Sequence, residues 1–343
     1  MSNSQTTRKG YRSLFWPIVL IGIGVIWLLG NLGVLTTSSL VVLARLWPLL
    51  LIVIGLDLLF GRQSPVIGAL IGVGAVVLAV ALMAVGPSLG LAGPSYDVQT
   101  ATFSEPRDDA TSASVNLALA VGSAAIVPLA DPANLFEADV RHLGELTFDV
   151  TGETGKTSKT IHLSENEVDH TSFFTPDLGI FGAAFDNRSE LRWNIGLSPQ
   201  VPLALTISGG VGDSELDLSA LQLTSLNLNL GVGAVTLRLP AADAAYSATI
   251  SSGVGAADIA IAPGAALTLT ISGGVGATTI DVPDGAAVRL EGEGGLGGMT
   301  VPGSLTLVSG DGDNGVWESE GFSSADRRIE IIFNGGVGGL TVR

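Results

Sequence analysis

A repeat of fixed length constrains the fold of the C-terminal half of this chain more than any other feature. Each copy has an alternating apolar run, a Gly-Val-Gly or Gly-Leu-Gly step, and a second alternating run that commonly ends in proline. The second glycine of successive copies falls 21 or 22 residues apart from Gly212 to Gly297. Such a period is typical of stacked supersecondary units, so we expect a β-solenoid with coils of about 21 residues. The glycines expected at the corners are Gly212, Gly233, Gly255, Gly276, Gly297 and Gly338, and an earlier copy surrounds Gly122.

The spacing of apolar residues within each copy predicts its strands. They fall at −7, −5 and −1 from the marker glycine, then at +4 and usually +6, as Leu269, Val275 and Ile280 do around Gly276. Alternation with period 2 indicates strands with one buried face, so we expect these side chains to point inward. Glycine suits a corner because it reaches positive φ. The proline near +7, such as Pro240, suits a second corner, where a missing N–H costs little.

The repeat is interrupted in two places, and it leaves one alternative fold open. Glycine-rich hairpins of a β-sandwich are that alternative, although sandwich strands seldom keep so constant a spacing. The 41 residues from Gly297 to Gly338 are close to twice the period, and we expect a degenerate coil there, around residues 305–317. Residues 129–192 break the pattern and are expected to form an irregular insertion in a β domain that spans 101–343.

The first 90 residues have the composition of a membrane anchor. Before residue 95 there are five basic residues and one acidic residue, Asp57, whereas the remainder holds 31 acidic and 11 basic residues, a net charge of −20. Apolar runs occupy residues 15–35, 40–60 and 66–85. About 20 helical residues cover the ~30 Å hydrocarbon core of a bilayer. We therefore expect a cytoplasmic tail at 1–13, an α-helical transmembrane bundle of three spans at 14–86, and a linker at 87–100.

Basic residues predict the orientation of this anchor. Arg8, Lys9, Arg12 and Arg62 lie on one side if all three runs span the membrane, and Arg45 lies near the other. By the positive-inside rule the N-terminus is cytoplasmic and the β domain lies outside the cytoplasmic membrane. A third run that formed a re-entrant hairpin would instead leave the β domain in the cytoplasm.

The first two apolar runs are copies of each other. FWPIVLIGIGVIWLL, which starts at residue 15, aligns with LWPLLLIVIGLDLLF, which starts at residue 46. Proline is tolerated in the first helical turn, and glycine lets two helices approach closely. The paired positions are Trp16, Pro17, Gly24, Trp47, Pro48 and Gly55.

These motifs together resemble a known bacterial group. The Trp-Pro repeat resembles the transmembrane region of LiaI- and LiaF-type envelope-stress proteins. Residues 193–240 are similar to the adhesin-like "toastrack" domain that follows it in LiaF- and PspC-type proteins, and the similarity continues to about residue 343. The resemblance implies a membrane-anchored sensor or regulator of envelope stress that acts with a two-component system, and it brings no catalytic residues. Its recognisable parts are Leu197-Ser198-Pro199, Val201-Pro202, Leu216-Asp217-Leu218-Ser219 and the Gly-Val-Gly corners.

The sequence offers little for catalysis, metals or cofactors. It has no cysteine, and its three histidines share no metal-binding spacing. The G-x-G-x-x-G pattern that ends at Gly297 runs into a strand-like segment rather than a helix, so we expect no dinucleotide site. Asp213 and the Asp311-Gly-Asp loop only partly match calcium motifs, so solvated turns are the expected structure. The acidity of the β domain argues against binding to nucleic acid.

Aromatic residues gather in one part of the insertion. Phe173, Phe174, Phe181 and Phe185 lie between residues 167 and 187, and aromatics are scarce elsewhere in the domain. They are expected to cover an open solenoid end, or else to contact the membrane or a partner.

We expect a non-enzymatic, multi-pass membrane protein that senses or regulates envelope stress through protein–protein contacts. Its partners would be membrane lipid and an envelope protein, either a two-component sensor kinase or a second copy. Two alternatives remain open. One is a structural adhesin or scaffold whose solenoids stack end to end, and the other is a transporter subunit.

Overall fold

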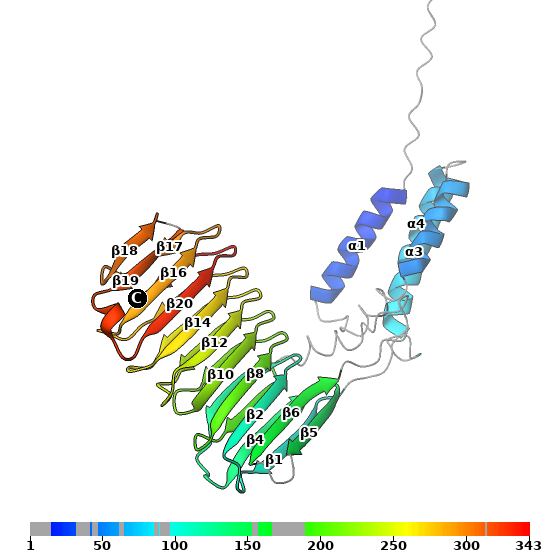
Figure 1. Ribbon diagram of the computed structural model, residues 1–343. Coiled ribbons are helices and arrows are strands. Elements are labelled where there is room, and N and C mark those ends of the chain that lie inside the picture. Colours follow the sequence, from blue (N-terminus) through cyan, green and yellow to red (C-terminus); the bar gives the residue numbers. More distant parts are fainter. Residues whose placement is uncertain are drawn as a thin grey trace, which may run out of the picture. The chain divides into compact units, whose positions relative to one another are not determined.

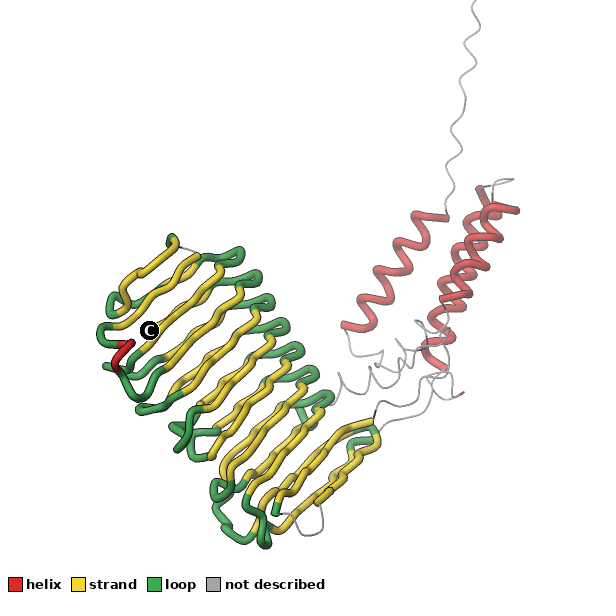
Figure 2. The backbone as a smooth tube through the Cα atoms, viewed as in Figure 1, coloured by secondary structure: helices red, strands yellow, loops and turns green. Residues whose placement is uncertain are grey.

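The structure is a computed structural model that describes residues 15–31, 42, 47–61, 65–85, 89, 97–152, 157–166, 189–312 and 314–343. Its contacts divide the chain into two compact units, one helical and one built from strands (Figures 1 and 2). In the β unit, strand β1 begins at Gln99, next to the expected boundary.

The helical unit contains α1 (Phe15–Asn31), α3 (Trp47–Leu56), the π-helical turn η1 (Asp57–Gly61) and α4 (Pro65–Val85). Proline stands in the first turn of all three α-helices, where its missing N–H has no partner to lose. Helix α4 is long and apolar enough to cross a membrane, and among the described residues it alone meets that test. Three spans, and their gathering into a bundle, stay predictions.

Two large sheets form the β unit, and we call them sheet A and sheet B. In spatial order, sheet A consists of β1 (Gln99–Pro106), β4 (Asn134–His142), β7 (Arg192–Leu197), β3 (Ser123–Pro128), β9 (Ser214–Asp217), β11 (Val235–Leu239), β13 (Ala257–Ile261), β15 (Thr278–Asp281), β21 (Leu340–Val342) and β17 (Met299–Thr300). Sheet B consists of β18 (Leu305–Gly310), β19 (Asn314–Ser319), β16 (Val288–Glu293), β20 (Ile329–Asn334), β14 (Leu267–Ser272), β12 (Tyr246–Ser251), β10 (Gln222–Asn229), β8 (Pro202–Ser208), β2 (Ser112–Ala118), β6 (Ser158–Asn166) and β5 (Glu145–Gly152).

The chain alternates between the sheets through most of the domain. We call one strand of sheet B, the glycine corner after it and the following strand of sheet A a rung. Neighbouring rungs pair in parallel, as Leu237 of β11 does with Ile259 of β13. Hairpins of a β-sandwich would give antiparallel pairs instead. Alternate side chains of both sheets, such as Leu228, Leu237 and Ile280, are buried at 1% exposure or less and pack into one core, as the alternation predicts.

The corners opposite the glycine corners are tight turns. In the turn from Ala262 to Ala265, the amide of Ala265 donates to the carbonyl of Ala262 at 3.2 Å. Pro263 precedes Gly264, whose φ is 76°. Proline followed by a glycine at positive φ is the pattern of a type II turn.

The stretch expected to be an irregular insertion supplies three strands and leads into a fourth, β7, so that expectation is wrong for its described part. β4 joins sheet A between β1 and β7, β5 and β6 form an antiparallel hairpin in sheet B, and β7 returns to sheet A. Strands β6 and β7 therefore lie outside rung β2–β3, which precedes them in sequence. The rings of Phe103 and Phe148 stack at 4.7 Å at this end.

The C-terminal end corrects a second expectation, because residues 305–319 form no coil. β18 and β19 make an antiparallel hairpin on the outer edge of β16. The chain reverses at Gly310, whose φ is 94°, and the amide of Asp311 donates to the carbonyl of Asn314 at 2.7 Å. Such a tight reversal returns the chain beside itself, whereas a coil needs a corner that leads across to sheet A.

The last rung then enters the sheets between rungs that were made before it. Ile331 of β20 pairs with Leu269 of β14 on one side and with Leu290 of β16 on the other (Figure 1). In sheet A, Leu340 of β21 pairs with Thr278 and Met299 in the same way. Order along the chain and order in space therefore differ at both ends of the domain.

Candidate functional site

The marker glycines form the corner between sheet B and sheet A. At the six glycines of the predicted set, φ lies between 144° and 150°, a region that is essentially restricted to glycine. Close stacking adds a second requirement. A Cβ built on Gly233 would lie 2.1 Å from the carbonyl oxygen of Gly212 in the next rung, and the other corners have similar contacts. These glycines let adjacent backbones approach, which assigns them a structural role.

The residue between the two glycines points away from the core. The amide of Val232 donates to the carbonyl of Gly210 at 2.9 Å, and the carbonyl of Val232 accepts from the amide of Gly212 at 2.8 Å. Its side chain is 49% exposed, and that of Val275 is 50% exposed. The expectation that the residue at −1 is buried is therefore wrong. The glycine corner breaks the strand alternation, so this position does not share the inward direction of Leu228.

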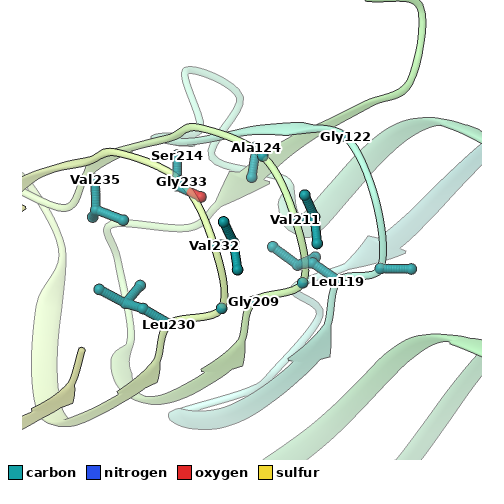
Figure 3. Close-up of a pocket in the computed structure, with 14 residues that line it drawn as sticks. Leu119, Gly122, Ala124, Gly209, Val211, Ser214, Leu230, Val232, Gly233 and Val235 are labelled. Atoms are coloured by element: carbon teal, nitrogen blue, oxygen red, sulfur yellow. The ribbon is translucent and has the colours of Figure 1, made fainter. Parts of the chain in front are cut away.

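These side chains form one continuous row across seven rungs, and successive members of the row are paired by parallel bridges. Figure 3 shows two neighbours, Val211 and Val232, at adjacent corners. Six of the seven side chains are exposed and Val121 is partly buried, so the row is a narrow, largely exposed apolar surface, which we call the valine ridge. In spatial order its members are Val121, Val211, Val232, Val254, Val275, Val337 and Leu296.

A small cavity lies behind the corners at one end of the ridge. It has a volume of about 20 Å³, and Leu119, Leu230 and Val235 line it together with backbone of the glycines (Figure 3). A space of this size holds about one water molecule. It is too small for an organic ligand.

A broad depression of about 740 Å³ lies on the outer face of sheet B, beside the loop that precedes β20. Its two arginines are engaged within the protein. Arg289 Nη1 lies 3.1 Å from Glu318 Oε1, and the Arg328 guanidinium lies 5.7 Å from the ring centre of Phe322. The depression is open, and these groups do not converge on one point, so its geometry favours no particular reaction.

Tyr246 lies below this depression and belongs to the core. Its hydroxyl donates to the carbonyl of Pro240 at 3.0 Å, and the residue is 5% exposed. Burial raises the pKa of the Tyr246 hydroxyl above its ordinary value, because the tyrosinate would be poorly solvated there.

Asp217 and Ser219 of the family-like motif form a local turn. Asp217 Oδ1 accepts hydrogen bonds from the Ser219 hydroxyl at 2.6 Å and from the Ser219 amide at 3.1 Å. The Ser219 hydroxyl bond is the largest influence that lowers the pKa of Asp217, and Arg238 adds to it. In the other part of the motif, Ser198 is buried, and its amide donates to Leu135 O at 3.0 Å. Both parts of this motif therefore stabilise loops of the fold and take no visible part in a binding site among the described residues.

Lys159 ties the N-terminal strand to sheet B. Its Nζ lies 2.7 Å from Glu105 Oε1, 2.7 Å from Asp108 Oδ2 and 2.8 Å from Pro106 O. Burial opposes the charged form, but the bonds to Asp108 and Glu105 outweigh it, so the pKa of Lys159 is raised. Asp108 has a φ of 47°, which is uncommon for a residue other than glycine. Sequence reasoning missed this cluster because Lys159 lies more than 50 residues along the chain from Glu105 and Asp108.

The remaining polar residues considered as sites, so far as the structure describes them, make hydrogen bonds within the fold. Asp213 Oδ1 accepts from the amide of Ala234 at 2.8 Å, and Asn314 Oδ1 accepts from Gly294 at 3.0 Å. His142 is buried, with Nδ1 2.8 Å from Gly144 O. No group of three or more potential metal ligands occurs among the residues that the structure describes.

In the helical unit, close approach occurs at Gly22. A Cβ there would lie 2.4 Å from Val76 Cγ2 of α4. An added Cβ at Gly24 or Gly55 would meet no atom of the described residues within 4 Å, so a helix contact through those two glycines stays a prediction. The four phenylalanines of the insertion, Phe173, Phe174, Phe181 and Phe185, lie outside the described residues, as do the side chains of Trp16 and Trp47.

Comparison with known families finds a match to part of each unit. Residues 14–59 match the LiaI-LiaF-like transmembrane region, and residues 94–260 match the N-terminal domain of toast_rack. The second match includes the stretch 129–192, to which sequence reasoning assigned no family. No curated protein matches the chain.

Solved structures with some likeness come from bacteria. A candidate cell adhesion protein from Clostridium sporogenes ATCC 15579 is 19% identical with a TM-score of 0.49, and the match covers 72% of this chain and 99% of that protein. A candidate adhesin from Bacteroides fragilis NCTC 9343 is 12% identical with a TM-score of 0.28, and the match covers 73% of this chain and all of that one.

Proposed function

Because this chain joins a LiaI-LiaF-like transmembrane region to a toast-rack domain, we propose that it is a non-enzymatic regulator or sensor of cell-envelope stress. The observation that carries this proposal is the presence of both regions, in this order, on one chain. The domain would act through protein–protein contacts, with a two-component sensor kinase as the partner class.

The architecture proposed for this role is a multi-pass anchor that displays a β-solenoid. Three spans at 14–86 follow from the apolar runs, and α4 supplies the longest of the described helices. Coils of about 21 residues agree with the pairing of Thr236 with Asp258 and of Asp258 with Thr279, which are 22 and 21 residues apart. A rod of paired rungs presents long, rigid faces, which suits recognition of other proteins better than chemistry on a small molecule.

The side of the membrane follows from charge. The basic residues near one end of the spans outnumber those at the other end, which supports a cytoplasmic N-terminus and an extracytoplasmic β domain. The chain has no native cysteine, so Thr279→Cys in the full chain gives a direct test. A membrane-impermeant maleimide should label it in intact cells. Labelling that requires lysis would place the domain in the cytoplasm.

An adhesin or scaffold whose solenoids stack end to end is the rival function. Its contact would be made by terminal strands, and the C-terminal end is poorly suited to it. β17 has only two residues, and the pairing of β18 with β19 shifts register next to Val308. Short and bulged edge strands hinder pairing with another sheet. These features favour the regulatory role.

The regulatory role is tested in the host bacterium. A reporter of the envelope-stress two-component system should change its response to a wall-acting antibiotic when the gene is deleted, and the full chain should restore the response. A chain that lacks residues 96–343 should reach the membrane without restoring it. An unchanged reporter in the deletion strain would refute the proposal.

A further inference from the structure

The composition of the valine ridge exceeds what the fold requires. At each of the seven rungs the residue before the marker glycine is aliphatic, although six of the seven are 46–76% exposed and only Val121 is partly buried. The backbone pairing between neighbouring corners favours a β-branched residue at this position but does not require an apolar one. Threonine has nearly the shape of valine and a comparable preference for strands, so it would serve there without exposing apolar surface. Seven aliphatic residues out of seven therefore indicate a surface that is covered by something.

The ridge is also nearly free of charge in a strongly acidic domain. Among the residues from two before to two after each ridge position, all of which the structure describes, only Asp213 is charged. The part of the chain from residue 95 onward carries a net charge of −20. A second acidic molecule could approach this strip with less repulsion than elsewhere on the surface. An anionic lipid surface would have to face the acidic flanks as well.

The spacing of the ridge selects its occupant. Parallel strands lie about 4.8 Å apart, so side chains recur along the ridge at that interval over roughly 29 Å. An apolar group can enter each gap between neighbouring valines only if the opposing surface has the same period. Another stack of parallel rungs has that period, and a second copy of this chain provides one.

We propose that the valine ridge is a self-association surface, through which two copies anchored in the same membrane pack side by side. The inference uses the membrane anchor of the proposed function but not the stress-sensing role. It differs from end-to-end stacking because the contact runs along the corners and leaves the terminal strands free.

The contact is expected to be weak in solution. A strip of half-exposed valines is narrow, whereas stable interfaces bury about 800 Å² on each partner. Confinement in a membrane raises the effective concentration of a second copy without any new contact. The association should therefore be measured with the full chain in vesicles.

The absence of native cysteine allows a direct measurement. Val254 lies at the centre of the row, with three members on each side. The Val254→Cys chain, reconstituted in phosphatidylcholine vesicles and treated with a short bismaleimide, should form a covalent dimer. Matched controls on the same rung are Thr249→Cys on the outer face of sheet B and Asp243→Cys at the opposite corner, both exposed. They should give about one tenth of that yield or less. Equal yields at the three positions would overturn the proposal.

A second set of variants separates an apolar contact from mere proximity. Val232→Thr and Val275→Thr, introduced together in the Val254→Cys chain, should lower the dimer yield about tenfold, because each copy loses apolar area on both sides of the centre. Thermal unfolding should change little, since both residues remain β-branched and half-exposed. An unchanged dimer yield would refute a role for the ridge.

The same cysteine distinguishes a bilayer as the occupant. An environment-sensitive fluorophore on Val254→Cys should not be quenched by spin-labelled lipids in the vesicles. Quenching, with no covalent dimer, would assign the ridge to lipid and overturn self-association. The envelope-stress reporter reads a separate property, so the failure of one proposal leaves the other measurable.

Discussion

Three glycine-to-alanine substitutions separate the contributions that glycine makes to the free energy of unfolding at a corner where rungs stack. Gly303→Ala adds a Cβ into open space. Gly264→Ala also meets no atom within 4 Å, but its φ is 76°. Gly255→Ala combines a φ of 149° with a Cβ only 1.9 Å from the carbonyl oxygen of Gly233. The series therefore separates chain entropy, backbone conformation and close approach.

The expected magnitudes follow from these contacts. Gly303→Ala should change the free energy of unfolding by less than about 1 kcal/mol. Gly264→Ala should cost about 1–2 kcal/mol, the strain of a left-handed alanine. For Gly255→Ala the backbone strain is about 1–3 kcal/mol. In addition, the rungs must separate, which weakens the ladder bonds to Val254 and Ala256, three in number at 2.9 Å each. Each of these hydrogen bonds contributes about 1 kcal/mol, so their loss together with the backbone strain gives a total cost of about 4–6 kcal/mol.

Urea unfolding of residues 96–343, followed by circular dichroism, measures all three. The native spectrum should be dominated by β-structure, as the two sheets require. If the Gly255→Ala variant did not fold at all, that result would still agree with the expected order of the three losses in unfolding free energy. The reasoning would be refuted if Gly255→Ala cost no more than Gly264→Ala, because the close approach between rungs would then carry no energetic weight.

Three further outcomes are expected from the same unfolding assay. Ile280→Asp should cost several kcal/mol because the side chain is fully buried, whereas Thr279→Asp should cost less than ~1 kcal/mol, and equal losses would show that the inward and outward faces are misassigned. Since burial raises the pKa of Tyr246, its contribution is complete below the ordinary tyrosine pKa of about 10 and is lost as pH rises toward the folded pKa. Tyr246→Phe should therefore flatten the alkaline loss of stability, and an equally steep loss in this variant would contradict the assignment. Lys159→Met removes a half-buried cation from two carboxylates and should cost about 1–2 kcal/mol, against less than ~1 kcal/mol for Arg238→Met at an exposed pair, so equal costs would deny the cluster its role.

Whether a side chain points toward the core or toward solvent could be predicted from the sequence wherever the strand is regular. The alternation that places Leu237 and Ile280 inward holds because each lies within a paired strand. At the corner it fails for Val232, because the direction of a side chain there depends on the φ of the neighbouring glycine. Periodicity records spacing and not torsion angles. The valine ridge was therefore visible in the sequence as a pattern but was assigned to the wrong face.

Pairing partners were the harder part of the fold. Residues 305–310 alternate as a strand of a coil would, and only the turn at Gly310 and Asp311 sends them back as a hairpin. The repeat likewise identifies the rung around Gly338 but does not say which rungs it will contact. That choice depends on matching edges far apart along the chain, which a reading of local pattern cannot rank.

The position of the final rung has a consequence for biosynthesis. Strands β20 and β21 follow β16–β19 in the sequence, yet each fills an internal position with a neighbouring strand on both sides. Domains usually begin to fold from the N-terminus while the ribosome is still adding residues. Here the hairpin β18–β19 and the strands β16 and β17 cannot take their places in the sheets until β20 and β21 have been synthesised. A chain that stops before residue 329 would thus lack the strand between β14 and β16 and the strand between β15 and β17. The strand edges left unpaired there could be recognised by proteases.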